Sequence, residues 1–155
     1  MEKIPSFTVN HLILNPGVYI SRIDVAGKEQ ITTYDLRITK PNAEPVMNTA
    51  EVHTIEHLGA TFLRNSEEKD NIIYFGPMGC RTGFYLITKK GLKQEGLMKL
   101  LKDTFSFIST YEGNIPGASA RDCGNYSDQS LDMAHYFAKK YLKTLDAIRD
   151  FQFSY

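Results

Sequence analysis

The feature that most constrains this chain is a pair of histidines, His53 and His57, that stand four residues apart in the stretch Val-His-Thr-Ile-Glu-His-Leu. On an α-helix, residues four apart project from one face, about one turn from each other. Glu56 follows His53 by three positions and therefore lies on the same side. Two imidazoles and a carboxylate on one helical face form part of a metal site. The fold must therefore bring a further ligand to this helix.

The residues around the histidine pair favour a helix from Ala50 to Asn65. Asn48 or Thr49, just before it, is a plausible N-cap. Gly59 interrupts the interior of this helix, where glycine costs about 1 kcal/mol relative to alanine. We therefore expect a close packing contact at Gly59 that a side chain would obstruct.

The remaining segments alternate between strand and helix patterns. Four of them have the apolar alternation of strands: 18–26, 33–39, 71–75 and 84–88. Two have helical periodicity: 92–112 and 128–150, the second with Ser127 as a candidate N-cap. Strands combined with three separate helices predict an α+β fold, with a mostly antiparallel sheet and helices packed on one face. With no linker or internal repeat, we expect one domain over residues 1–155.

Charge and hydropathy exclude several classes of function. Basic and acidic residues are equal in number, 18 of each, so we expect neither a nucleic-acid partner nor a membrane surface. No apolar run approaches the roughly 20 residues that a membrane span needs. The N-terminal residues lack a hydrophobic signal core, so we do not expect secretion.

Three residues are candidates for the third metal ligand: Cys123, His11 and Glu112. Cys123 is preferred because it lies in a long loop, 113–127, that is rich in glycine and polar residues and is able to fold back over the helix. The chain has only two cysteines, too few for a disulfide scaffold. Imidazole suits zinc and ferrous iron alike, so the ligand types do not name the metal.

Two further side chains are candidates for proton transfer or nucleophilic chemistry. Glu56 lies beside the histidines without being needed as a ligand, which suits a general base. Cys80 lies in a loop with three glycines among eight residues, between the third and fourth predicted strands. A thiol in such a loop near a metal is expected to act as nucleophile or as acid and base.

Five short motifs occur along the chain in a specific order and spacing. They are Ser6-Phe7 with His11, Asp35-Leu36-Arg37, His53-Thr54-Ile55-Glu56-His57-Leu58, Pro77-Met78-Gly79-Cys80-Arg81-Thr82-Gly83-Phe84-Tyr85 and Cys123-Gly124. With these motifs the chain resembles the S-ribosylhomocysteine lyase (LuxS) family over essentially its whole length.

This resemblance implies an α+β sandwich of the LuxS/MPP-like metallohydrolase type, in a homodimer of the bacterial cytosol with two active sites at the subunit interface. The metal is expected to be ferrous iron (Fe2+), one per subunit, which zinc replaces on purification. By resemblance, the metal ligands are His53, His57 and Cys123, and the acid/base pair is Glu56 and Cys80. The residues expected to line the substrate pocket are Ser6, His11 and Arg37.

The reaction implied by the resemblance cleaves the thioether of S-ribosyl-L-homocysteine to L-homocysteine and 4,5-dihydroxy-2,3-pentanedione, the precursor of autoinducer-2. It links the activated methyl cycle to quorum sensing. Two carbonyl migrations along the ribose precede a β-elimination, and each step needs a base and an acid. One departure from the family pattern is Tyr74, at a position where many members carry an aspartate expected to hold the amino-acid end of the substrate.

Two other functions remain as alternatives. An inverted-motif zinc metallopeptidase shares the H-x-x-E-H spacing and would use a downstream glutamate such as Glu112 as its third ligand. It would leave the motif around Cys80 without a role. A non-catalytic metal-binding domain is the third hypothesis, and it predicts that Cys80 affects stability alone.

Overall fold

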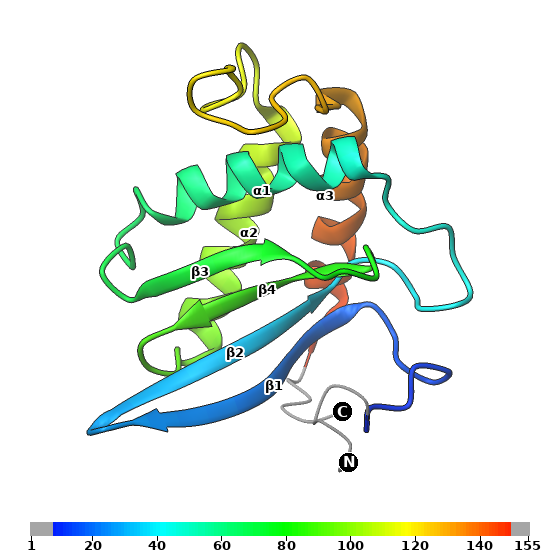
Figure 1. The fold of residues 1–155 in the computed structure, drawn as a ribbon. Helices are drawn as coiled ribbons and strands as arrows, with labels where there is room; N and C mark the ends of the chain where they lie inside the picture. Colours follow the sequence, from blue (N-terminus) through cyan, green and yellow to red (C-terminus); the bar gives the residue numbers. More distant parts are fainter. Residues whose placement is uncertain (1–7, 150–155) are drawn as a thin grey trace, which may run out of the picture.

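Four antiparallel strands form a single sheet in the order β1-β2-β4-β3. The computed structural model of the protein describes residues 8–149, and Figure 1 shows how they are arranged. The strands span Gly17–Ala26 (β1), Glu29–Arg37 (β2), Ile72–Pro77 (β3) and Gly83–Thr88 (β4). β1 and β2 form one antiparallel hairpin, and β3 and β4 form a second hairpin around the glycine-rich loop.

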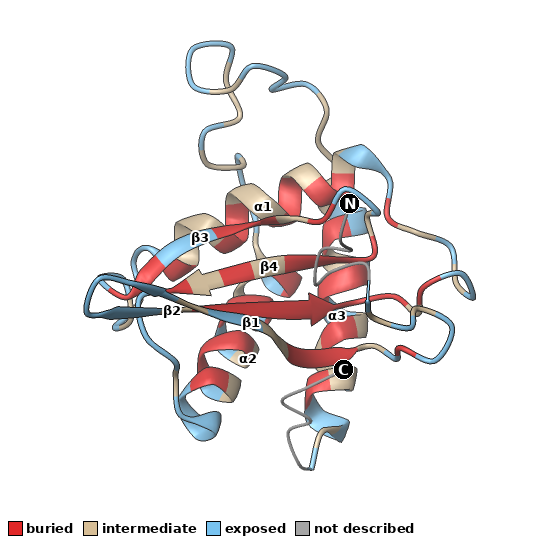
Figure 2. Ribbon diagram, turned by 60° about the horizontal axis from the view of Figure 1, so that its bottom comes forward, coloured by how far each residue is buried: buried red, intermediate tan, exposed pale blue. Residues whose placement is uncertain are grey.

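Three helices pack against this sheet. They span Thr49–Leu63 (α1), Gln94–Thr110 (α2) and Leu131–Ala147 (α3). The α1 helix packs along the edge strand β3 and against both other helices, while α2 and α3 pack on each other. Figure 2 shows the buried positions gathered between the sheet and the helices. The predicted α+β class, with its antiparallel sheet, is confirmed.

The buried faces of the helices follow the periodicity of the sequence. On α2 the buried residues recur every three or four positions: Leu97, Leu100, Leu101, Thr104, Phe105 and Ile108. The predicted close contact at Gly59 is also confirmed, because a Cβ atom added there would lie 2.4 Å from Cε1 of Phe75 on β3. Only glycine therefore lets α1 approach the sheet this closely.

The helix starts confirm one predicted cap and correct another. Asn48 is the N-cap of α1, and its backbone N–H donates to the Glu51 carboxylate at 2.6 Å in a capping box. The prediction of Ser127 as N-cap of the last helix is wrong, since α3 begins after Ser130. Ser127 instead lies within a turn, where the Asp128 N–H donates to the Asn125 carbonyl at 3.2 Å.

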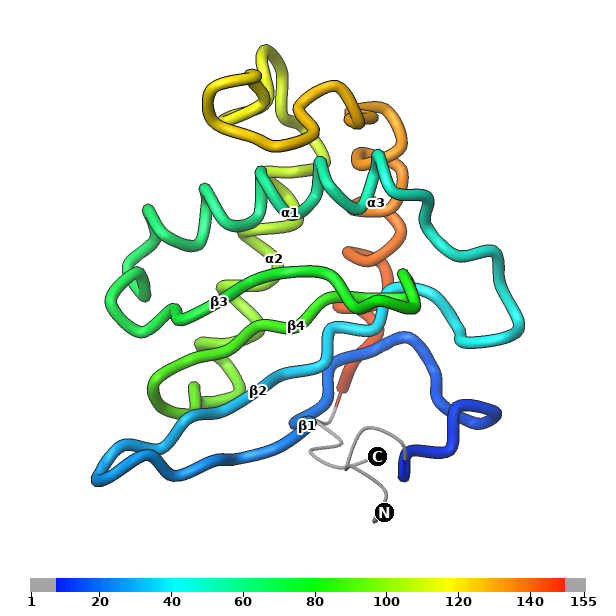
Figure 3. Tube along the Cα trace, in the orientation of Figure 1, coloured from blue at the N-terminus to red at the C-terminus, as the bar shows by residue number. Residues whose placement is uncertain are grey.

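The long segment 111–130 joins α2 to α3. Figure 3 shows it, coloured yellow to orange, folding back beside α1. It has no helix or strand of its own, and short turns closed by backbone hydrogen bonds give it shape. Within residues 8–149, none of the helices has both the length and the hydrophobicity that crossing a membrane requires.

Candidate active site

The α1 helix and the 111–130 loop together bring three metal-binding side chains to one point. His53 and His57 lie one turn apart on α1, with ring centroids 4.6 Å apart. The loop adds Cys123, whose Sγ lies 3.3 Å from Nε2 of His53. The potential ligand atoms of all three residues lie within 4.8 Å of one another. One ion at the roughly 2.0–2.3 Å distances of zinc-type ligation fits this donor set.

The loop also fixes the orientation of both imidazole rings. Nδ1 of His53 lies 3.0 Å from the Asp128 carbonyl, and Nδ1 of His57 lies 2.7 Å from the Pro116 carbonyl. A carbonyl accepts only, so each Nδ1 carries the proton and each Nε2 is left with its lone pair. This is the arrangement that metal-ligating histidines commonly show.

The loop packs closely against α1 beside these two rings. Gly117 has φ +71°, and a Cβ added there would lie 3.3 Å from Nδ1 of His57. The Thr54 hydroxyl accepts the Ser130 backbone N–H at 2.9 Å and lies 2.7 Å from the Gln129 side-chain amide. The start of α3 is therefore tied to α1 through Thr54, the residue that follows His53.

A cavity of about 400 Å³ lies between α1 and the β3–β4 connection. This volume is in the range of small-molecule sites. Glu56 is half-buried in its wall, beside His53. The lining residues are Thr49, Val52, His53, Glu56, Pro77, Met78, Gly79, Arg81, Asn125 and Asp128. The histidine face of α1 and the loop that carries Cys80 therefore bound the same space.

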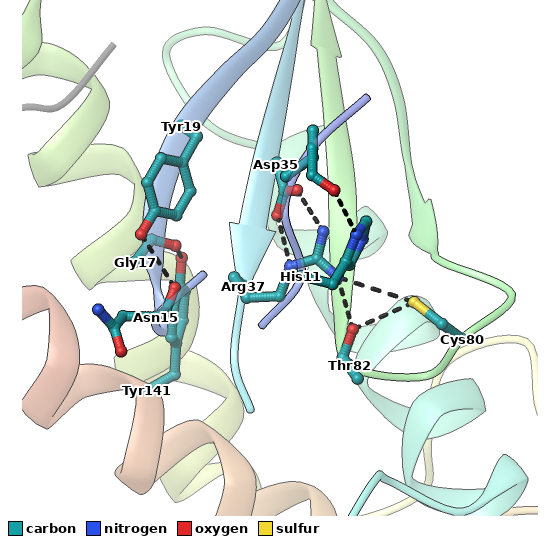
Figure 4. A network of polar contacts seen from close by, with 10 residues as sticks. His11, Asn15, Gly17, Tyr19, Asp35, Arg37, Cys80, Thr82 and Tyr141 are labelled. Carbon is teal, nitrogen blue, oxygen red and sulfur yellow. Dashed lines mark hydrogen bonds and ion pairs between the residues drawn. The ribbon is translucent and has the colours of Figure 1, made fainter. Parts of the chain in front are cut away.

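Cys80 is exposed, and its sulfur belongs to a polar network that runs from β2 (Figure 4). Arg37 Nη1 lies 3.7 Å from Cys80 Sγ and 2.6 Å from the Thr82 Oγ1 to which it donates. Thr82 Oγ1 lies 3.1 Å from the same sulfur. On its other side Arg37 forms a two-pronged ion pair with Asp35, and both residues are buried.

This network changes the acidity of the thiol. Burial by itself would raise the pKa of Cys80, but hydrogen bonds from the hydroxyl and backbone of Thr82 and the charge of Arg37 outweigh it. The pKa of Cys80 is therefore lowered from its ordinary value. A thiol with a lowered pKa is ionised over more of the neutral range, which suits a base.

The strand register explains why Arg37 reaches this loop. Arg37 pairs with Gly83 at the end of the β2–β4 ladder, so it lies beside Thr82 and Cys80. A Cβ added at Gly83 would lie only 2.3 Å from the Leu36 carbonyl, so glycine permits this close pairing. Beyond β2, the N–H groups of Ile38 and Thr39 both donate to the Thr82 carbonyl.

The other predicted residues that the structure describes are not members of the metal-binding group. His11 is in the segment before β1, where its Nδ1 bonds to the Val9 carbonyl at 2.9 Å. Ser6 lies outside the described residues. Glu112 is exposed at the start of the loop and does not join the three ligands. Tyr74 is partly exposed on β3, with its hydroxyl folded over Gly76.

Some residues of the site were not assigned a role from the sequence. Thr82 stands two positions from Cys80, but the chain turns at Arg81 (φ 58°), so this spacing does not by itself predict their contact. Gln129 and the carbonyls of Pro116 and Asp128 carry no signal in the sequence. Their part in the site depends on the path of an irregular loop.

Comparison with known proteins agrees with this geometry. A model of the S-ribosylhomocysteinase (LuxS) family matches residues 4–151. The chain belongs to this family. A LuxS-family protein of Finegoldia magna named S-ribosylhomocysteine lyase is 62% identical over 149 residues, covering 96% of this chain and 95% of that protein. Proteins with the same name from Clostridium acetobutylicum and Borrelia garinii are 58% and 50% identical, each over 100% of this chain and 99% of their own length.

Proposed function

We propose that this protein is a metal-dependent carbon–sulfur lyase. Its substrate is S-ribosyl-L-homocysteine, and its products are L-homocysteine and 4,5-dihydroxy-2,3-pentanedione, the autoinducer-2 precursor of quorum sensing. The observation that carries the proposal is the pairing of a His53-His57-Cys123 donor group with an activated Cys80 loop around one cavity. Relatives named for this activity match along nearly the whole chain, in line with one catalytic domain over residues 1–155.

The metal proposed for this site is ferrous iron (Fe2+), one per subunit, held by His53, His57 and Cys123. When bound, it supplies Lewis acidity toward the sugar oxygens without redox change. The two Nδ1–H···O bonds and the Asn125 N–H, which donates to Cys123 Sγ at 3.5 Å, keep the three donors oriented. Zinc fits the same donors and replaces iron on purification.

Glu56 and Cys80 are the proposed acid/base pair. Glu56 lines the cavity on the α1 side, and Cys80 lies in the β3–β4 connection between Gly79 and Arg81, which line the cavity on the other side. Each carbonyl migration removes a proton from one sugar carbon and returns one to its neighbour, moving the carbonyl from C1 to C2 and then to C3. The C3 carbonyl acidifies the C4 proton, whose removal expels the homocysteine thiolate from C5. The chain thus keeps two proton carriers beside one substrate.

The residues proposed to bind substrate are Ser6, His11 and Arg37. Arg37 is oriented by Asp35 and reaches the sulfur of Cys80, and these contacts support a role for it beside the reacting part of the sugar. Tyr74 offers a phenol in place of the carboxylate that is expected to hold the substrate ammonium. We propose that the homocysteine end is held by other groups in this protein.

A homodimer of the bacterial cytosol, with active sites at the interface, is the proposed assembly. Large apolar side chains are exposed on the segment before β1 and on the β1–β2 hairpin: Leu12 (78%), Ile13 (72%), Ile23 (53%) and Val25 (78%). Exposed apolar groups of this kind are typical of surfaces that bind a partner. The two free cysteines agree with a reducing compartment.

The third metal ligand separates this proposal from a zinc peptidase. Cys123→Ala should lose most of the bound metal during gel filtration, because two imidazoles alone hold an ion weakly. The matched control, Glu112→Gln, should keep wild-type metal content measured by elemental analysis. Retention of metal by Cys123→Ala, with loss by Glu112→Gln, would support the peptidase instead.

A further inference from the structure

Thr82 is a buried residue of the Cys80 network whose hydroxyl takes part in none of the proton transfers proposed above. It is 4% exposed and immediately precedes β4. Its Oγ1 lies 2.6 Å from Arg37 Nη1 and 3.1 Å from Cys80 Sγ. Figure 4 shows the hydroxyl between the guanidinium and the sulfur.

The direction of these hydrogen bonds follows from their donors. A guanidinium has no acceptor, so Arg37 donates to Thr82 Oγ1. The hydroxyl then has one proton to donate, and among the residues that the structure describes its only other side-chain partner is Cys80. The Thr82 proton is therefore directed at the sulfur. Arg37 Nη1 points a second donor at the same atom.

A sulfur that accepts hydrogen bonds from two donors, one of them cationic, is favoured in its anionic form. The lowered pKa of Cys80 agrees with this arrangement. Asp35 is fully buried and holds Arg37 from the other side, so the guanidinium cannot turn away. The chain of contacts from Asp35 through Arg37 and Thr82 therefore restricts the position of the Cys80 sulfur.

The backbone of the β3–β4 connection keeps Thr82 and Cys80 on the same side. Arg81, between them, has φ 58°, a left-handed conformation that costs a non-glycine residue about 1–2 kcal/mol. Three backbone hydrogen bonds hold the turn: Arg81 N–H to Met78 O (2.9 Å), Met78 N–H to Gly83 O (3.0 Å) and Met47 N–H to Arg81 O (3.2 Å). The sulfur–hydroxyl contact is thus built into the turn.

We propose that Thr82 is a positioning residue for Cys80: its hydroxyl accepts from Arg37 and donates to the sulfur, which holds Cys80 as an oriented thiolate. The use of that thiolate as a base depends on the proposed lyase function, whereas the network itself does not. Thr82 need not touch the substrate.

Other charged or titratable groups surround this sulfur, and a test must leave them in place. From β2 they are Asp35 and Arg37, and from β4 there is Tyr85, whose raised pKa is due first to burial and then to charges that include Asp35. Arg81 lies on the connection and Glu56 on the α1 wall of the cavity. His11 lies in the segment before β1. Substitution at Thr82 alone removes none of them.

The test compares Thr82→Val, which keeps the branched shape without the hydroxyl, with Thr82→Ser, which keeps the hydroxyl. The measurement is the pH midpoint of iodoacetamide alkylation at Cys80 in the metal-loaded protein. Peptide mass spectrometry follows Cys80 by itself, because Cys123 is also a thiol. The midpoint in Thr82→Val should rise by about one pH unit, the size expected for losing a hydrogen bond to a charged acceptor.

Thr82→Ser should keep a midpoint close to that of the wild-type protein. In Thr82→Val the acidic side of the pH profile of kcat/KM should shift to higher pH by the same amount as the alkylation midpoint. The reason is that Cys80 cannot act as a base while it is protonated. A Thr82→Val midpoint equal to wild type, in a protein with unchanged circular dichroism, overturns the inference. If the valine variant does not fold, Thr82→Ala answers the same question.

Alkylation needs no substrate, so the two proposals fail separately. If the midpoint shifts as expected but the wild-type protein releases no homocysteine, the lyase function fails and the positioning role stands. If the wild-type protein releases homocysteine but the midpoint does not shift, the positioning role fails alone.

Discussion

At the scale of single residues, Cys80 and Cys123 have surroundings that direct them to different chemistry. The Cys123 sulfur lies 3.3 Å from the metal-facing nitrogen of His53. The Cys80 sulfur lies beside a guanidinium and a hydroxyl that lower its pKa. Coordination fits the first environment and proton transfer fits the second.

Removal of the Cys80 thiol should therefore abolish activity without loss of metal or fold. We expect Cys80→Ala to lower kcat by about 10²–10⁴-fold, the usual contribution of a positioned acid/base group. Because Cys80 is exposed, the melting temperature should stay close to that of the wild-type protein. Homocysteine release and elemental analysis check the two statements.

The matched control is Cys80→Ser, which keeps the size of the side chain but not its acidity. It should be as inactive as Cys80→Ala, because a serine hydroxyl is not ionised at neutral pH. Either variant with more than half of wild-type activity would remove Cys80 from the mechanism and favour a purely structural thiol.

At residue scale, the identity of the chemical groups was accessible from the sequence but their partners were not. The four-residue spacing of His53 and His57 predicts that both side chains lie on one face of a helix, because this depends on local helix geometry alone. The contact of Arg37 with Thr82 depends on the register between β2 and β4, which pairs Arg37 with Gly83. No local pattern specifies a register between β2 and β4, which are separated in the sequence by a helix and another strand.

At the scale of elements, α1 presents His53 and His57 on one face and also packs closely against the sheet. Gly59→Ala would bring a Cβ atom within 2.4 Å of the Phe75 ring. Overpacking of this kind costs about 1–3 kcal/mol, whereas alanine gains about 1 kcal/mol in helix propensity. We expect a net loss of about 1 kcal/mol in the free energy of unfolding, measured by urea denaturation.

Gly96 on α2 provides the control for this substitution, because nothing lies within 4 Å of a Cβ added there. Gly96→Ala should stabilise the protein by up to about 1 kcal/mol, since helix propensity acts without a clash. If both variants were stabilised equally, the contact of α1 with β3 would be looser than described.

The elements themselves differ in how far sequence patterns predict them. Periodicity predicted α2 and the four strands to within a few residues, because each buries one regular face. The 111–130 loop has no period, and its path over α1 depends on contacts such as His57 with Pro116. The start of α3 was misplaced for the same reason: Ser127 belongs to the last turn of that loop.

At the scale of the whole molecule, one cavity joins elements from both halves of the chain. The α1 helix, the β3–β4 connection and the 111–130 loop all contribute to its wall. The α1 helix and the 111–130 loop carry the metal-binding group. The α1 helix and the β3–β4 connection carry the two proposed proton carriers. The match to the S-ribosylhomocysteinase family model, over residues 4–151, includes all of these segments.

The most direct test of this account is the release of free thiol from S-ribosylhomocysteine. The iron-loaded protein is incubated with substrate under anaerobic conditions, and homocysteine is followed with a thiol reagent after the protein is removed. We expect catalytic release with multiple turnovers, and none with Cys123→Ala. No thiol release from protein that contains one iron per subunit would contradict the proposed function.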